Sequence, residues 1–144
     1  MALAKSLDHP TGILEPRDTK TTVAGWLRDL KNLPQVACPL THLFAPGVYL
    51  RQITMPAGTL VIGKIHRTEH FNVIERGKFA IRHDDGRVET LQAPVTFVSK
   101  AGVQKVLYII EDTVWKTIHA TSETDLEKLE ALLIEAPAAL EALP

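Results

Sequence analysis

The stretch GTLVIGKIHRTEHFNVIERG, residues 58–77, places two histidines four positions apart between two apolar runs. His66 and His70 stand just before the second run, and Lys64 precedes His66 by two positions. Imidazole nitrogens are common ligands of zinc and of other first-row transition metals. Histidines at strand ends also occur at the surface or paired with backbone groups. The spacing by itself therefore fits a metal site and a purely structural role.

The composition indicates one ordinary globular domain. A chain of 144 residues can bury one core but is short for two, and 45% hydrophobic residues is a normal share. The net charge of -1, without a basic run, predicts no nucleic-acid partner. Cys38 is the single cysteine, which indicates a reducing compartment and a small buried side chain. We see no signal peptide and no apolar run of the ~20 residues that span a bilayer, so we expect a cytoplasmic protein without membrane contact.

Residues 47–120 read as strands almost throughout, because Val, Ile, Thr, Tyr and Phe recur between short turn signals. Seven or eight short strands at this spacing predict an antiparallel sandwich or barrel, and no long helical pattern interrupts them. The expected strand segments are GVYLRQITM (47–55), TLVIGKIH (59–66), FNVIERGKFAIRH (71–83), RVETLQ (87–92), VTFVSK (95–100), KVLYIIE (105–111) and TVWKTIHAT (113–121). The turn signals are Pro56-Ala57-Gly58, Asp84-Asp85-Gly86, Ala93-Pro94, Ala101-Gly102 and Glu111-Asp112.

The two ends of the chain have helical patterns. Within an N-terminal arm of residues 1–46, the segment TTVAGWLRDLKNLP (21–34) has apolar residues at helical spacing and ends at a proline. From residue 121 to 144 we expect a helix followed by an Ala/Leu-rich tail. Thr124 and Glu127 have the form of a capping box at the start of this helix. Its apolar face is expected to contain Leu126, Leu129, Leu132 and Leu133.

The quoted stretch resembles the first motif of the cupin family, written G-x5-H-x-H-x3 or 4-E-x6-G, whose histidines and glutamate commonly bind a metal. Gly58 opens the motif here and Gly77 closes it without a gap. Lys64 stands at the first histidine, His66 at the second, and His70 at the glutamate. The resemblance covers roughly residues 45–120. It implies a mainly β, single cupin-like antiparallel jelly-roll barrel, with an N-terminal and a C-terminal helix packed outside.

The second cupin motif, G-x5-P-x-G-x2-H-x3-N, is weakly represented. Only Gly102 is kept in the expected turn. Pro94 stands at the opening glycine, Lys100 at the proline, Lys105 at the histidine and Ile109 at the asparagine. The usual four-ligand site therefore cannot form.

Strand alternation offers a replacement ligand. Trp115 and His119 fall on one face of the last strand, and Asn72 shares a face with His70. If these faces line the barrel, His66, His70 and His119 would hold a divalent first-row metal such as Zn, Fe, Ni or Cu. Asn72 and Trp115 would then line the ligand pocket, although packing roles are the simpler interpretation for aromatic residues.

The lysines suggest a second interpretation. Lys64 and Lys105 replace two metal ligands, and side chains that entered the cavity would make it cationic. Such a pocket would suit a carboxylate, a phosphate or a sugar acid. Both lysines could instead point into solvent, as most lysines do. The other histidines lie in polar or loop-like contexts and are not expected to have a functional role; they are His9, His42 and His83.

Three functions follow from these patterns. The first is a small metal-binding cupin, acting as a dioxygenase, isomerase or lyase on a small oxygenated or acidic metabolite, with the catalytic residue left unassigned. The second is a non-catalytic sugar- or anion-binding cupin. The third is a virion-associated protein, because GVYLRQITMPAGTLVIGKIH (47–66) and EDTVWKTIHATSETDLEKLE (111–130) are similar to small cupin-like proteins of bacteriophages. The resemblance implies a homo-oligomer, dimer or larger, and for a phage protein other phage partners and a place in the virion.

Overall fold

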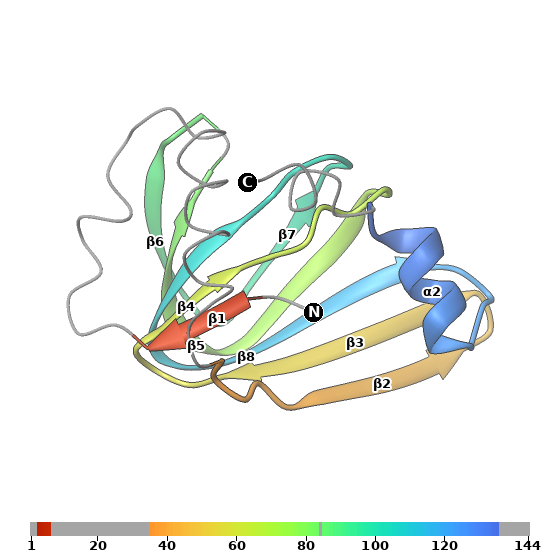
Figure 1. The fold of residues 1–144 in the computed structure, drawn as a ribbon, viewed down its shortest axis with the longest axis horizontal. Coiled ribbons are helices and arrows are strands. Elements are labelled where there is room, and N and C mark those ends of the chain that lie inside the picture. Colours follow the sequence, from red (N-terminus) through yellow and green to blue (C-terminus); the bar gives the residue numbers. More distant parts are fainter. Residues whose placement is uncertain (1–2, 7–34, 84, 136–144) are drawn as a thin grey trace.

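The computed structural model describes residues 3–6, 35–83 and 85–135 (Figure 1). The helix expected at 21–34 lies outside these residues. The described part is mainly strand, as predicted, and contains one short helix. Its elements are β1 (Leu3–Ser6), β2 (Leu40–Ala45), β3 (Val48–Met55), β4 (Thr59–Ile62), β5 (His70–Arg82), β6 (Val88–Gln92), β7 (Val95–Ser99), β8 (Val106–Ala120) and α2 (Leu126–Leu133).

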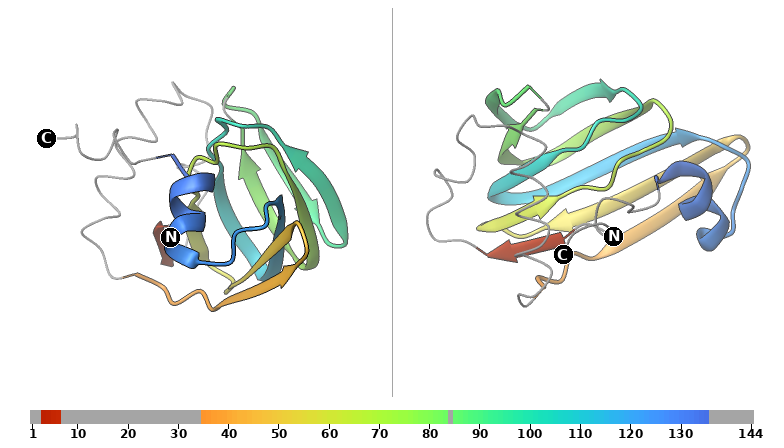
Figure 2. Two further views of the ribbon diagram at one scale, coloured as in Figure 1. Left: turned by 90° about the vertical axis from the view of Figure 1, so that its right-hand side faces the viewer. Right: turned by 45° about the horizontal axis from the view of Figure 1, so that its top comes forward.

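All of the pairings in the sheet are antiparallel. The strand order is β1-β4-β8-β3-β2, and β5 extends the sheet by pairing with β6, β7 and β8. β8 is the long central strand that contacts β3, β4 and β5 along different parts of its length. The sheet curls around an interior in Figures 1 and 2. The predicted single antiparallel barrel of jelly-roll type is confirmed.

Several strand boundaries differ from the sequence-based prediction. The turn expected at Glu111-Asp112 is wrong, because β8 runs through both residues. Its register against β5 shifts there instead, beside Gly77. Gly77 has φ +113°, and a Cβ added to it would lie 2.3 Å from Thr113 Oγ1. Because the two backbones come close at Gly77, β5 and β8 bend together. The chain forms a β-bulge here in place of the turn that the sequence predicted.

The strand set also begins earlier than residue 47. β1 pairs with β4, and β2 forms a hairpin with β3 from Leu40↔Ile53 to Ala45↔Val48. At the other side, β4 ends at Ile62 rather than continuing to His66. His66 therefore lies in the connection between β4 and β5, where its position depends on neighbouring elements.

The interior has an apolar part and a part left open. Residues that alternate along β3, β5 and β8 point inward and pack around Phe79 and Trp115. A second, smaller cluster joins Tyr49 of β3 to Leu129 and Leu133 of α2. The space between the two clusters is where the candidate site lies. The main cluster consists of Ile53, Met55, Val61, Ile74, Phe79, Ile81, Leu107, Ile109 and Trp115.

Helix α2 begins one residue later than the capping box predicted. Asp125, not Thr124, is the N-cap, and its carboxylate accepts hydrogen bonds from the backbone N–H groups of Glu127 and Lys128. Only two of the four leucines expected on the apolar face are buried, because α2 is eight residues long and contacts the barrel over one narrow stripe. Leu126 and Leu132 are 48% and 53% exposed. In the described part of the chain, no helix is long and apolar enough to cross a membrane.

The C-terminal end of α2 is attached to the β4–β5 connection by backbone hydrogen bonds. The N–H of Arg67 donates to the carbonyl of Leu133 over 2.7 Å, and the N–H of Glu135 donates to the carbonyl of Ile65 over 2.8 Å. His66 and Ile134 form an isolated antiparallel bridge between these contacts. The helix therefore lies across one end of the curved sheet, and the left view of Figure 2 looks onto this end. Its backbone contacts hold the segment that contains His66.

Candidate metal centre and ligand cavity

Three imidazole rings meet at the end of the barrel that α2 covers. His66 comes from the β4–β5 connection, His70 is the first residue of β5, and His119 lies near the end of β8. The ring centroids of His66 and His70 are 4.3 Å apart, those of His70 and His119 are 4.8 Å apart, and those of His66 and His119 are 5.3 Å apart. The structure thus brings together the three residues that the sequence nominated as metal ligands.

Each ring has one buried nitrogen without a hydrogen-bond partner in the described structure. These atoms are Nδ1 of His66, Nε2 of His70 and Nδ1 of His119. The second nitrogen is paired in two of the rings: Nδ1 of His70 lies 3.0 Å from the carbonyl oxygen of Thr68, and Nε2 of His119 lies 3.2 Å from Oγ1 of Thr117. Because buried polar atoms usually have a partner, these three nitrogens are candidates for binding a group between the rings.

All three rings are held neutral. Burial, reinforced by the nearby charges of the other histidines and of Lys105 and Arg51, lowers the pKa of His66 to about 2. Burial likewise lowers the pKa of His119 to about 4. Burial also lowers the pKa of His70, although the carbonyl of Thr68 acts in the opposite direction. Neutral imidazole is the form that binds metals, so no proton has to be displaced near pH 7.

The spacing of the rings, though not their present orientation, fits an ion between them. A metal about 2.1 Å from a ring nitrogen lies roughly 3.2 Å from the ring centroid, so rings at ~90–109° have centroids about 4.6–5.3 Å apart. The measured separations of 4.3–5.3 Å are close to this range. As the rings stand, no group of three or more His, Cys, Asp or Glu among the described residues is arranged to hold a metal. Binding therefore requires the rings to turn about the Cβ–Cγ bond, a torsion with broad minima.

A cavity of about 280 Å³ is lined by His66 and His119, two of the three histidines, and is covered by α2. This volume is close to the lower end of the ~300–1,000 Å³ that is usual for small-molecule sites. Its wall is mostly apolar, with a few polar and charged groups. The apolar lining comprises Leu40, Ile53, Met55, Val61, Leu107, Trp115, Leu126, Leu129, Leu133 and Ile134.

Asn72 and Trp115 both line the cavity, and their side chains are hydrogen-bonded to each other. The indole N–H of Trp115 donates to Oδ1 of Asn72 over 3.0 Å, and Nδ2 of Asn72 donates to Oγ of Ser99 over 2.8 Å. The Trp115 ring also packs against Phe79 and Phe97. The two residues therefore form a fixed wall of the cavity, and their hydrogen-bonding groups are already used within the protein.

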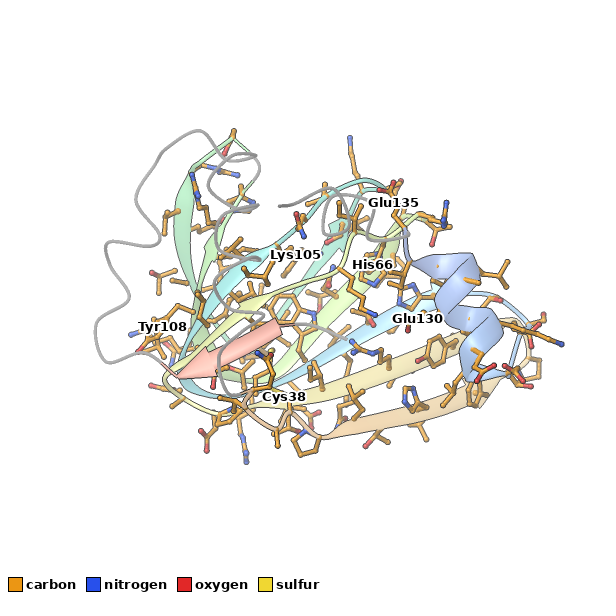
Figure 3. All side chains as sticks on the ribbon, viewed as in Figure 1. Cys38, His66, Lys105, Tyr108, Glu130 and Glu135 are labelled. Carbon is orange, nitrogen blue, oxygen red and sulfur yellow. The ribbon has the colours of Figure 1, made fainter. Side chains whose placement is uncertain are left out.

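The two lysines differ in what they contribute. Lys64 lines the cavity, but its ammonium group forms an ion pair with the Glu130 carboxylate on α2. Lys105 also lines the cavity, and its charge contributes to lowering the pKa of all three histidines. His66, Lys105 and Glu130 are labelled in Figure 3. Lys64 thus helps to hold the helix in place, whereas Lys105 adds positive charge to the part of the cavity lined by His66 and His119.

Three cavity residues were missed by the sequence analysis. His42, for which no functional role was expected, lies on β2 and lines the cavity, where its Nδ1 is 2.7 Å from the Tyr49 hydroxyl. Tyr49 stacks on His119 with the ring centroids 5.8 Å apart. Arg51 also lines the cavity. The alternation Tyr49, Arg51, Ile53 in the strand segment 47–55 was the available signal, because it places an arginine between two inward-facing residues.

Several other residues with titratable or reactive side chains lie away from the cavity or outside the described structure. Nε2 of His83 is 3.1 Å from the Glu89 carboxylate in a half-exposed pair. Glu75 forms an ion pair with Lys116 on the outer face of the sheet. Cys38 is half-buried beside the apolar cluster, and His9 lies outside the described residues.

Comparisons with known proteins identify the fold. No family model and no curated protein matches the chain. A double-stranded β-helix protein of the RmlC-like cupin family from Methanocaldococcus jannaschii is 14% identical, with a TM-score of 0.50 over 58% of this chain and 80% of that one. A Neisseria meningitidis protein is 10% identical (TM-score 0.50, 65% and 94% covered). A Salmonella typhimurium protein attributed to ethanolamine utilization is also 10% identical (TM-score 0.51, 61% and 72% covered). The chain therefore has the cupin-type jelly-roll fold.

Proposed function

We propose that this chain is a small metal-binding cupin that holds a first-row divalent ion on His66, His70 and His119. The ligand would be a small oxygenated or acidic molecule in the adjoining cavity. The observation that carries this proposal is the set of three neutral imidazoles, each with a buried nitrogen that lacks a partner among the described residues. Their centroid separations, 4.3–5.3 Å, are close to those expected around one shared ion.

The ion, when bound, would act as a Lewis acid toward an oxygen of the ligand. The chain's own residues would exclude water and fix the ligand's position. The leucines of α2 close the cavity from one side, and the Trp115–Asn72 pair forms a rigid wall on the other. Lys105 would favour a ligand that carries negative charge near the histidines. Dioxygenase, isomerase or lyase chemistry remains a prediction, and we assign no general acid or base.

Elemental mass spectrometry of dialysed, untagged protein tests the metal proposal. We expect about one equivalent of a first-row metal in the wild type and a loss in His66→Ala and in His119→Ala. His83→Ala is the matched control, because His83 pairs with Glu89 away from the cavity. Metal retained in both cavity variants, or absent from every wild-type preparation after supplementation with Zn, Fe, Ni or Cu, would contradict the three-histidine site.

A metal-free anion-binding pocket is the second candidate. It is favoured by the positive charge of Lys105 and Arg51 at the cavity, and by the absence of the fourth ligand of the second cupin motif. Chelation separates the two functions, because ligand binding that survives metal removal needs only the cationic groups. The virion-associated alternative rests on the sequence resemblance alone, and it predicts that His66→Ala leaves assembly with other phage proteins intact.

A further inference from the structure

The cavity combines a large apolar wall with one arginine that none of the sequence motifs indicated. Arg51 lies on the inward face of β3, opposite His42 of β2 and Thr117 of β8. It is half-buried and lines the cavity. An arginine keeps its charge in a protein under all ordinary conditions, so a permanent cation is placed against an otherwise largely apolar surface.

The guanidinium group of Arg51 has no direct partner in the described structure. No hydrogen bond or ion pair joins it to another described residue, although it interacts at longer range with Tyr49 and Glu130. The carboxylate of Glu130 accepts a hydrogen bond from the ammonium group of Lys64 and forms its ion pair there. The five N–H donors of a guanidinium form a fork that matches a carboxylate, so the donors that the described residues leave unused are suited to binding one.

Arg51 is close to the candidate metal centre but separate from it. Tyr49, two residues earlier on the same face, is paired in register with His119 and stacks on it. Two residues along a strand span about 7 Å, so the arginine backbone lies one layer deeper than the histidine layer. A ligand of a few bonds in length can therefore contact both places at once.

We infer that Arg51 is the anchor for the carboxylate of an apolar monocarboxylic acid, whose body lies against the apolar wall beside Ile53, Met55 and Leu107. The inference deepens the proposed function and rests on it only for the role of the metal end. The planar fork of a guanidinium pairs bidentately with a carboxylate or a phosphate. The mostly apolar lining favours the carboxylate, because a phosphate carries more charge and costs more to desolvate. The extent of the apolar wall selects a hydrocarbon or aromatic body over a sugar acid.

Calorimetric titration with benzoate, with benzamide as the uncharged isostere and with inorganic phosphate, tests this inference on the full chain. The variants are Arg51→Gln, Arg51→Lys and the matched control Arg76→Gln, which removes an exposed arginine from β5. We expect the wild type to bind benzoate and to bind benzamide and phosphate at least tenfold more weakly. Arg51→Gln should weaken benzoate binding by about 10- to 100-fold, Arg51→Lys by less, and Arg76→Gln not at all.

Equal benzoate affinity in wild type and Arg51→Gln, or no benzoate binding by the wild type at millimolar concentration, overturns the inference. So does a preference for phosphate over benzoate. Metal content measured on the same samples separates the two proposals. An Arg51-dependent affinity for benzoate in protein that never holds metal supports the anchor while refuting the metal centre. Normal metal content, together with benzoate binding that is unchanged in Arg51→Gln, supports the metal centre and refutes the anchor. Circular dichroism of each variant confirms that it is folded.

Discussion

Two substitutions in the first cupin motif have different consequences for their side chains. Lys64, at the first histidine of the motif, turns to Glu130 of α2 and forms an ion pair that is partly exposed to solvent. His70, at the glutamate, stays in the interior and is only 4% exposed. A histidine at this position replaces a carboxylate with a second neutral nitrogen donor. With His119 the proposed metal site would be an all-imidazole set, which would suit a borderline ion such as zinc or iron(II) better than a hard one.

Gly77 gives a prediction at the residue scale. A Cβ at this position would lie 2.3 Å from Oγ1 and 2.6 Å from Cα of Thr113, and the backbone has φ +113°. We expect Gly77→Ala to lower the free energy of unfolding by about 3 kcal/mol or more, because both strain and a backbone clash oppose the methyl group. Urea denaturation measures the change.

Gly102 is the matched control for Gly77. It also has positive φ, +83°, but nothing lies within 4 Å of an added Cβ. We expect Gly102→Ala to cost only about 1 kcal/mol from backbone strain. If the two substitutions proved equally mild, the close contact between β5 and β8 at Gly77 would not be needed for the fold.

At the scale of elements, α2 is the part that closes the site. It is short, and only Leu129 and Leu133 are buried. Its other attachments are the ion pair with Lys64 and the backbone contacts near His66. A helix of eight residues is not stable alone in water, so these contacts and its N-cap determine how long it stays in place.

Asp125 gives the prediction for this element. Its carboxylate accepts from two backbone N–H groups, 3.0 and 3.1 Å away, at the start of α2. We expect Asp125→Ala to destabilise the helix by about 1 kcal/mol. Hydrogen exchange of the α2 amides should then be roughly fivefold faster, while the amides of β8 keep their protection. Unchanged exchange in α2 would show that tertiary contacts, and not the cap, hold the helix.

At the scale of the whole molecule, the outer face of the sheet contains an apolar row that crosses five strands. Cross-strand pairing aligns Leu43 with Leu50, Ile118, Phe71 and Val98. Three members are 47–58% exposed. Soluble monomers rarely expose a continuous apolar patch of this kind. The homo-oligomer expected from the sequence remains a prediction, and this row is the surface at which to test it.

We expect light scattering after gel filtration to give a mass above that of the monomer, 15.9 kDa, for the wild type. Phe71→Lys should weaken self-association at least tenfold, because it places a charge at the centre of the row. Gln92→Lys, at an exposed position on β6, serves as the control for added charge. A wild type that is monomeric at high micromolar concentration would rule out a homo-oligomer under those conditions.

The buried histidines make stability depend on pH. In the unfolded chain each imidazole takes up a proton near pH 6.5, whereas the folded pKa is about 4 for His119 and about 2 for His66. The unfolded state therefore binds more protons below pH 6.5, and the free energy of unfolding falls as the pH drops. The slope approaches about 1.4 kcal/mol per pH unit for a fully buried histidine such as His119.

Urea denaturation of chelator-treated protein between pH 7.5 and pH 5 checks this prediction. The window excludes most of the effect of Glu75 and Glu130, whose pKa values are lowered from 4.5 by their lysine partners. His119→Gln should have a shallower pH slope than the wild type. A wild-type stability that stays constant from pH 7.5 to pH 5 would mean that the rings are not desolvated as the structure indicates.

The sequence predicted those features that depend on local periodicity. Strand alternation placed His119 and Trp115 on one face and Asn72 with His70 on another, and both faces point inward. The turn and strand residues predicted the barrel, because side-chain direction in a strand alternates whatever the partner is. The same alternation places Arg51 on the inward face between Tyr49 and Ile53, at a position that neither motif contains.

The cavity itself was decided by tertiary structure. That His66 meets His119, fifty-three positions later, depends on how β8 pairs with β3 and β5 and on how α2 holds the β4–β5 connection. That Lys64 pairs with Glu130 and Arg51 remains without a direct partner in the described structure depends on where the helix docks. Local sequence determines which way a side chain points along its own strand. Long-range strand pairing determines which other groups the side chain contacts and how far they are buried from solvent. No short stretch of sequence contains that information.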